Sequence, residues 1–114
     1  KALKNKNKKF IQEIVNNNIH GDFSHADDIC KAIYKLSITD KKIKNLILSS
    51  NKCTHINEIV KFLIKKNKLK IKIKFNTFKK TDCLVGNNLK AIKLLKWKPK
   101  KNIFIAAQEM FSVK

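Results

Sequence analysis

Three polar residues near the start of the chain are candidates for chemistry. Asp27 and Asp28 are adjacent carboxylates, and His25 stands just before them. A carboxylate pair can act as general acid and base, and a histidine can move a proton. Adjacent carboxylates at a helix start are far more often caps, and no partner nucleophile accompanies His25. We interpret all three as caps or ordering contacts, so the sequence predicts no catalytic residue.

The remaining ligand-type side chains lack the spacing of a metal site. They are three histidines and three cysteines, namely His20, His25, His55, Cys30, Cys53 and Cys83. The cysteines form no CxxC pair, and an odd number of widely spaced cysteines makes no disulfide framework. We therefore expect no metal, reduced thiols and a cytoplasmic location.

The charge of the chain is strongly positive and comes from one residue type. All 27 basic residues are lysine, and with 8 acidic residues the formal net charge is +19. Such a balance can indicate a nucleic-acid partner. Sequence-specific readers and phosphate clamps rely on the bidentate arginine fork, which this chain lacks. We attribute much of the charge to an AT-rich coding sequence, and a small Lys-rich binding module for nucleic acid or an acidic partner stays an alternative.

The first half of the chain alternates apolar runs with amphipathic segments. Residues 1–9 are a basic, low-complexity lead-in to a domain over residues 10–114. Residues 10–15 alternate as a strand does, although a helix turn fits nearly as well, and we interpret them as a strand. Residues 45–50 have the pattern of a short buried strand. The apolar stripe over residues 26–36 predicts a helix capped by Ser24 or Asp27, and Thr54 is expected to cap a second helix.

The second half begins with a strict period of two. Residues 69–75, LKIKIKF, predict a strand with its lysines on a wet face. Asn87 or Asn88 can cap a helix that must end before Pro99, since proline removes a donor.

Trp97 then lies where a ring can cover the end of a core. Asn102 is expected to cap the last helix, with its inward face made by Ile103, Ala106, Ala107 and Met110. No apolar run approaches the length of a membrane span. The predicted fold class is α/β, a small mixed domain of about four helices and three to four short strands.

Three segments, in this order, resemble the C-terminal third of the extended short-chain dehydrogenases/reductases (SDR), the NAD-dependent epimerase/dehydratase family of nucleotide-sugar enzymes. Residues 21–36 are similar to the family's Arg-Asp-Phe/Trp segment and the Asp-started helix after it. Residues 45–63 are similar to its strand, turn and Ser/Thr-capped helix. The most specific match is the closing pattern, which here consists of Asp82, Gly86, Lys90, Ala91, Leu95, Trp97, Pro99, Lys100, Glu109 and Met110. Within the family the chain most resembles the GDP-mannose 4,6-dehydratase type.

The resemblance implies that the catalytic half of such an enzyme is absent from this chain. The family needs a Gly-rich dinucleotide loop and a Tyr-x-x-x-Lys pair. Neither of the two glycines lies in such a loop, and Tyr34 is followed four residues later by Ile38. NAD(P) would be bound by the missing N-terminal Rossmann domain, and no cofactor is expected for this chain alone. Its first residue is Lys rather than Met, so we expect it to be processed, excised or incomplete.

The resemblance also implies where a nucleotide sugar binds. Two arginines commonly hold the nucleotide diphosphate in the family, and Gly21 and Thr77 occupy their places here. Lys79 and Lys80 lie close to the second place and can supply charge, although not the planar arginine fork. The implied substrate-binding set is Gly21, Asp22, Phe23, Thr77, Lys79 and Lys80.

The sequence thus predicts the C-terminal, nucleotide-sugar-binding fragment of an NAD(P)-dependent 4,6-dehydratase or epimerase, inactive alone. The parent would be a cytoplasmic lyase or epimerase of nucleotide-sugar metabolism that feeds polysaccharide biosynthesis and can form homo-oligomers. The implied partners are a nucleotide sugar of GDP-mannose type and the Rossmann half, with no membrane and no nucleic acid. A lone fragment should expose an apolar patch. The second alternative is an inert remnant of a decayed gene.

Overall fold

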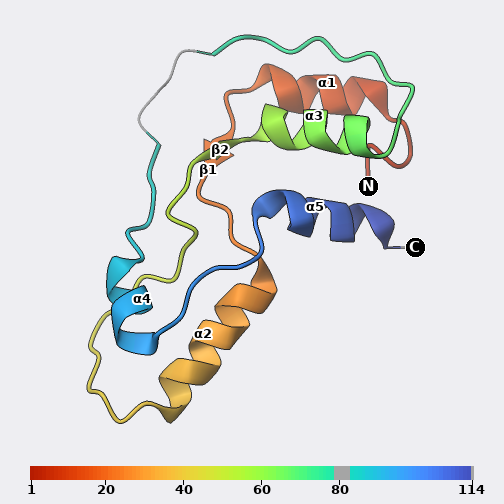
Figure 1. Cartoon of the computed structure of the whole chain (residues 1–114). Helices are drawn as coiled ribbons and strands as arrows, with labels where there is room; N and C mark the ends of the chain where they lie inside the picture. Colours follow the sequence, from red (N-terminus) through yellow and green to blue (C-terminus); the bar gives the residue numbers. More distant parts are fainter. Residues whose placement is uncertain (79–82, 114) are drawn as a thin grey trace.

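The computed structural model describes residues 1–78 and 83–113, which form a small mixed α/β fold. These residues contain, in chain order, α1 (Lys8–Asn16), β1 (His20–Gly21), α2 (Ala26–Ile38), β2 (Thr54–His55), α3 (Ile56–Lys66), α4 (Leu89–Leu95) and α5 (Ile103–Ser112). Figure 1 shows α1, α3 and α5 at one end of the molecule and α2 with α4 at the other. The two strands pair antiparallel between these ends, with His20 opposite His55.

The first apolar cluster forms where α3 contacts both α1 and α5. One stripe of α3 is buried because its apolar residues recur every three to four positions. The buried members of the cluster are Leu3, Ile11, Val15, Ile59, Val60 and Leu63.

Residues 10–15 belong to α1, so the expected strand is wrong. Asn7 begins the helix, and its side chain accepts a hydrogen bond from Phe10 N. Ile11 and Val15 are 2 % and 0 % exposed, respectively. Burial four residues apart is the spacing of a helix rather than of a strand. Six residues are too few to separate the period of a helix from that of a strand. The structure shows that they lie within the longer helix α1.

The second apolar cluster joins α2 to α4. Ala32 and Ala91 are fully buried at this contact, and their small side chains let the two helices approach closely. The predicted helix over residues 26–36 is confirmed and extends to Ile38. Trp97 is 3 % exposed and belongs to this cluster, which confirms that its ring covers the end of a core.

The last two helices begin and end close to the predicted residues. α4 ends at Leu95, and Lys96 then takes a left-handed conformation with φ of 50°, before Pro99. The Asn102 side chain accepts from Ile105 N at 3.0 Å, which confirms it as the cap of α5. Met110 was expected to face inward, and this is wrong, since it is 77 % exposed.

Two of the expected strands do not form in the described part of the chain. Residues 45–50 are extended, with Leu46 and Leu48 against the second cluster. Residues 69–75 keep their alternation, because the four apolar side chains pack on the first cluster and the three lysines are exposed. No second strand lies beside them among the described residues; instead Lys74 N and O bond the Gln12 side chain.

Histidines, not Ser24, Asp27 or Thr54, cap the second and third helices. The Nδ1 atom of His25 accepts from Asp27 N at 3.0 Å at the start of α2. In the same way, His55 Nδ1 accepts from Asn57 N at 3.1 Å at the start of α3. A ring nitrogen thus replaces the oxygen that usually satisfies a helix donor.

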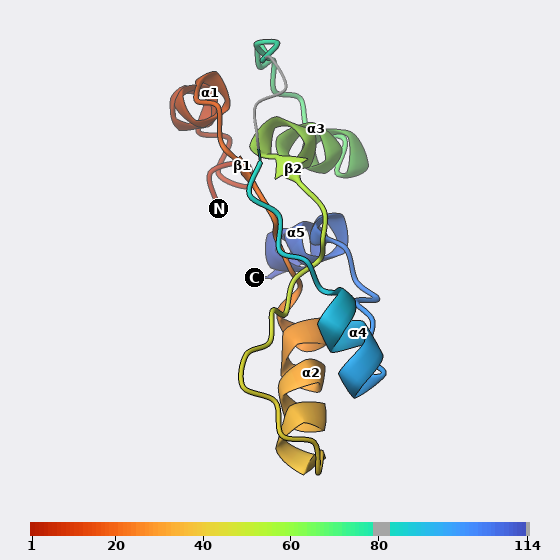
Figure 2. The same cartoon turned by 90° about the vertical axis from the view of Figure 1, so that its left-hand side faces the viewer.

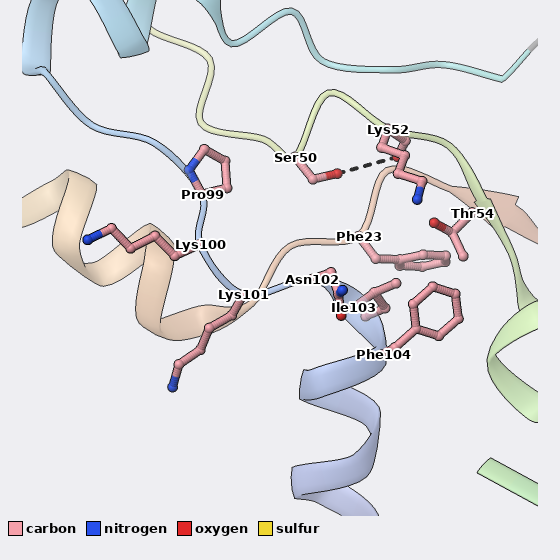
Figure 3. Close-up of a pocket in the computed structure, with 10 residues that line it drawn as sticks. All are labelled: Phe23, Ser50, Lys52, Thr54, Pro99, Lys100, Lys101, Asn102, Ile103 and Phe104. Atoms are coloured by element: carbon pink, nitrogen blue, oxygen red, sulfur yellow. Dashed lines mark hydrogen bonds between the residues drawn. The ribbon is translucent and has the colours of Figure 1, made fainter. Parts of the chain in front are cut away.

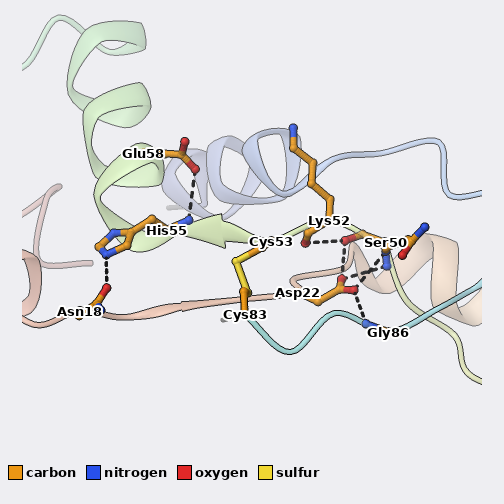
Figure 4. The surroundings of a disulfide bond; sticks show 10 residues. Asn18, Asp22, Ser50, Lys52, Cys53, His55, Glu58, Cys83 and Gly86 are labelled. Carbon is orange, nitrogen blue, oxygen red and sulfur yellow. Dashed lines mark hydrogen bonds between the residues drawn. A yellow bond between two sulfur atoms is a disulfide. The ribbon is translucent and has the colours of Figure 1, made fainter. Parts of the chain in front are cut away.

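The expectation of three reduced thiols is also wrong. Cys53 and Cys83 form a disulfide with their Cα atoms 6.1 Å apart, whereas Cys30 is free and exposed. Figure 4 shows this bond beside β2, between segments that are far apart in the sequence. Spacing could not predict the pair because the fold alone brings the two cysteines together.

The molecule is less compact than a globular domain of the same length. Its extents are 52 × 35 × 17 Å, and its radius of gyration is 16.8 Å, against about 13 Å for a compact domain of this size. Figure 2 shows the narrow profile. An apolar groove of about 820 Å³ lies along α1, α3 and α5, and Phe10 on its rim is half exposed. No helix in the described part is both long and apolar enough to cross a membrane.

Candidate functional site

Asp22 lies at the centre of the region where the two halves of the chain meet. Its Oδ1 accepts from Ser50 N at 3.0 Å and from the Ser50 hydroxyl. Its Oδ2 accepts from Asn51 N at 3.1 Å and from Gly86 N at 3.0 Å. Figure 4 shows this convergence on one carboxylate. Asp22 therefore ties three segments together and positions the chain around it.

Gly86 completes this junction through a close approach to the side chains of Ile47 and Ser49. Its carbonyl oxygen accepts from the Ser49 hydroxyl at 2.6 Å. A Cβ at Gly86 would lie 2.6 Å from Ser49 Oγ and 2.9 Å from Ile47 Cγ2. The buried Asn88 side chain donates to Ser49 O at 2.8 Å and holds the same two segments together. The junction thus requires a residue without a side chain at position 86.

Asp28 makes a second junction, between α2 and the segment before α5. Its buried Oδ2 accepts from Lys100 N at 3.1 Å and Lys101 N at 2.8 Å, and its carbonyl accepts from Trp97 Nε1 at 2.8 Å. Trp97 and Pro99 are the most specific part of the family resemblance, so the closing motif of the sequence builds this junction.

A polar network surrounds the start of α2. His25 Nε2 lies 2.8 Å from Glu109 Oε2; because Nδ1 already accepts from Asp27 N, the ring proton lies on Nε2 and is donated to Glu109. Lys101 Nζ lies 2.8 Å from Asp27 Oδ2. That hydrogen bond lowers the pKa of Asp27 and raises the pKa of Lys101. His25, Asp27, Lys101 and Glu109 thus hold α5 and the segment before it against the start of α2.

A small pocket opens between these two junctions (Figure 3). Its cavity volume is about 160 Å³. It lies at the start of α5 and is lined by Phe23, Ser50, Lys52, Thr54, Pro99, Lys100, Lys101, Asn102, Ile103 and Phe104. Among the described members of the implied substrate-binding set, Phe23 alone lines this pocket.

Two other members of that set, Gly21 and Asp22, lie at β1. Gly21 belongs to β1, and Asp22 follows it. Phe78 stacks on His55 with ring centroids 5.1 Å apart, and His55 stacks on His20 at 6.0 Å. Thr77 is exposed and directly precedes Phe78 in the chain. Lys79 and Lys80 lie outside the described residues.

Several residues of this region carried no signal in the sequence. The partners of Asp22 lie 28 to 64 residues away, and His20 and Phe78 gain their roles only through the stack on His55. The repeated pattern of a histidine two residues before the donor N–H, in HAD and HIN, is the one local signal for the caps.

The described residues contain neither a dinucleotide-binding glycine loop nor a cluster of metal-ligand side chains. Gly86 is packed against Ser49 and Gly21 lies in a strand, so neither opens a helix as a dinucleotide loop does. No three His, Cys, Asp or Glu side chains gather anywhere in residues 1–78 and 83–113.

Two solved structures resemble the chain. RMD from Pseudomonas aeruginosa, complexed with NADPH, matches with a TM-score of 0.70 and 17 % identity over 83 % of this chain and 32 % of that one. MoeE5, in complex with UDP-glucuronic acid and NAD, matches with a TM-score of 0.62 and 16 % identity over 90 % of this chain and 40 % of its own. This chain has the fold of one part of each protein. It spans about a third to two-fifths of their lengths, and no family model or curated protein matches it.

Proposed function

We propose that this chain is the C-terminal, nucleotide-sugar-binding part of an NAD(P)-dependent nucleotide-sugar dehydratase or epimerase, of the GDP-mannose 4,6-dehydratase type. The observation that carries the proposal is the fold likeness to part of two proteins, one complexed with NADPH and the other with UDP-glucuronic acid and NAD. The chain binds substrate and leaves hydride and proton transfer to residues outside it. Its parent acts in the cytoplasm, in polysaccharide biosynthesis.

The closing motif supports this proposal independently of the fold comparison. Trp97 is buried against the second cluster, and its ring N–H donates to Asp28 O. The main-chain N–H groups of Lys100 and Lys101 bond the Asp28 carboxylate. The residues that carry the family resemblance are thus the ones that hold α2, α4 and α5 together.

The apolar groove along α1, α3 and α5 supports an N-terminal Rossmann half as partner. Buried apolar side chains such as Ile11, Ile59 and Leu63 line its floor. The two similar proteins have about 60 to 70 % of their length outside the matched part. An open molecule with such an apolar groove gains stability when another part of the protein covers the groove. We place the missing half on this groove, in a parent that can form homo-oligomers.

The proposed substrate contacts lie beside the strand pair. Gly21 leaves room for a diphosphate near the main chain, Phe23 offers a ring, and Thr77 offers a hydroxyl on the same side. Lys79 and Lys80 supply positive charge. The four N–H and O–H donors around Asp22 occupy its carboxylate, so Asp22 acts by positioning its neighbours.

A thermal melt with added ligand tests the proposal. GDP-mannose, UDP-glucuronic acid and a short RNA are added separately to the full chain. A ligand at 100 times its Kd stabilises the folded state by about 2.7 kcal/mol, which raises Tm by on the order of 10 °C for a chain of this size. We expect the largest shift with GDP-mannose, and we expect the Lys79→Gln/Lys80→Gln variant to lose it.

The matched control is Lys70→Gln/Lys72→Gln, which removes the same charge from exposed lysines on another segment. It should keep the shift with GDP-mannose. A shift with RNA alone, lost in this control and falling steeply with salt, would replace the proposal with the Lys-rich binding module. No shift with any ligand would contradict nucleotide-sugar binding and leave an inert remnant.

A further inference from the structure

We propose that the pocket at the start of α5 binds an oxyanion of phosphate size. The pocket lies between Thr54 of β2 and the first turn of α5, and the inference does not rest on the proposed function. It begins with Thr54 in β2, which is 3 % exposed and lines the pocket. Its hydroxyl has no hydrogen-bond partner among the described residues and is turned toward the pocket in Figure 3. A hydroxyl that is accessible from the pocket and makes no hydrogen bond within the described residues can donate to a bound acceptor.

The first turn of α5 supplies two further donors. The Asn102 side chain takes the N–H of Ile105, and the Asn102 carbonyl takes that of Ala106. The N–H groups of Ile103 and Phe104 have no partner among the described residues, and both residues line the pocket. Free N–H groups and the positive end of the helix dipole together favour an anion at this position.

Lys52 supplies the positive charge. Its ammonium group makes no hydrogen bond or ion pair within the described residues, and Figure 3 shows it on the same side as the Thr54 hydroxyl. Lys100 and Lys101 line the pocket with their main chain, whereas their ammonium groups extend away from it. Lys101 is also paired with Asp27. Lys52 is therefore the lysine that faces the bound anion.

Neighbouring carboxylates do not compete for these donors. Asp28 already accepts two main-chain N–H groups from residues 100 and 101. Asp22 accepts the N–H and hydroxyl of Ser50 and two further N–H groups. Both carboxylates thus accept hydrogen bonds from other groups. A ligand can therefore bind the donors of the pocket, which belong to Lys52, Thr54, Ile103 and Phe104.

The size of the pocket selects the ligand class. Its volume of about 160 Å³ exceeds the ~30 Å³ share of one liquid water, so a tetrahedral oxyanion fits. Whole small-molecule ligands need about 300–1,000 Å³, so a complete nucleotide sugar does not. The pocket therefore takes inorganic phosphate or a single phosphoryl group of a larger molecule.

A titration of the full chain with inorganic phosphate tests the inference. The readout is the set of amide resonances in a nitrogen-15 NMR spectrum, at constant ionic strength with chloride as the balancing ion. We expect saturable shifts of the Ile103 and Phe104 amides. Thr54→Val and Lys52→Met should each raise the Kd for phosphate at least tenfold. Lys100→Met removes the same charge from a side chain that extends away from the pocket, and it should leave the Kd unchanged.

Two results would overturn the inference. One is the same Kd in wild type, Thr54→Val and Lys52→Met, with the remaining resonances showing that each variant is folded. The other is a non-saturable shift spread over many surface lysines, which indicates an adventitious ion only. Displacement of phosphate by GDP-mannose would identify the phosphoryl group of a larger ligand, and phosphate binding without displacement would identify a free oxyanion. Either keeps the oxyanion site, whatever the melt with nucleotide sugars shows.

Discussion

Asp22 and Asp28 use their carboxylates to join segments of chain. Each accepts main-chain N–H groups from residues more than 25 positions away in the sequence. Such charge-assisted bonds are about twice as strong as neutral ones, so a loss at either aspartate releases more than one segment. In this chain the carboxylates position residues rather than react.

Gly86 should be intolerant of a side chain, whereas Gly21 should accept one. Gly86→Ala places a Cβ 2.6–2.9 Å from Ser49 and Ile47 atoms, so overpacking should lower the free energy of unfolding by about 1–3 kcal/mol. A Cβ at Gly21 meets nothing closer than the Phe23 ring at 3.6 Å. Chemical denaturation of both variants checks the contrast. Equal midpoints for the two variants would contradict the packing at Gly86.

Contacts within a short stretch of sequence were easier to predict than contacts between distant segments. His25 was expected to be an ordering contact, and it caps α2 and bonds Glu109. The junction at Asp22 could not be predicted, because its partners are brought together only by the tertiary fold. The same holds for the hydroxyl of Thr54, which was expected to cap a helix and instead faces a pocket.

At the scale of elements, helices were predicted better than strands because a helix satisfies its own hydrogen bonds. The helices α2, α3, α4 and α5 follow from apolar spacing, although the caps expected for α2 and α3 were wrong. A strand also needs a neighbour, and alternation cannot say whether one exists. Residues 69–75 show the difference, since they keep two faces without joining a sheet in the described part of the chain.

The ion pair between α2 and the start of α5 predicts a dependence on pH. The Lys101 hydrogen bond lowers the pKa of Asp27, so its stabilisation is present above the ordinary carboxyl pKa and lost as pH falls through the lowered value. The raised pKa of Lys101 keeps the pair up to the ordinary lysine pKa, and it is lost as pH rises through the raised value. The pair therefore contributes between about pH 4 and pH 10.

Asp27→Asn should consequently lower Tm at pH 7 and have a smaller effect at pH 2. The effect at pH 7 should be small, because the pair is exposed. Asp40→Asn is the matched control, since Asp40 is exposed and without an ion pair among the described residues. Melts of both variants at the two pH values separate the pair from a general change in charge. If Asp27→Asn lowers Tm at pH 2 by as much as at pH 7, the ion pair is not the cause of the change.

At the scale of the whole molecule, the disulfide joins the middle of the chain to its last third. Cys53 and Cys83 are separated by 30 residues. Closing a loop of this length stabilises the folded state by about 3–4 kcal/mol in the chain-entropy account. In an open molecule with two separate apolar clusters, this link adds a constraint that the packing does not provide.

Cys53→Ser should therefore lower the free energy of unfolding by about 3–4 kcal/mol, and reduction of the wild type by a dithiol should lower it similarly. Cys30→Ser is the control, because Cys30 is free and exposed, and it should behave like wild type. Denaturation with and without the dithiol measures both. A wild type that is insensitive to the dithiol, with full reduction shown by thiol counting, would rule out a stabilising role for the bond.

The unpaired segment over residues 69–75 has a consequence for how copies of the chain meet. Leu69 N and the main chain of Lys74 are hydrogen-bonded, but the N–H and C=O groups of residues 70–73 have no partner among the described residues, and such groups are the usual template for edge-to-edge aggregation. Two copies aligned along this edge would bring the rows of Lys70, Lys72 and Lys74 together, and like charges opposite each other on neighbouring strands repel. The alternating lysines thus act as gatekeepers against fibril growth, so the high lysine content of the chain has a physical use where its sheet is incomplete.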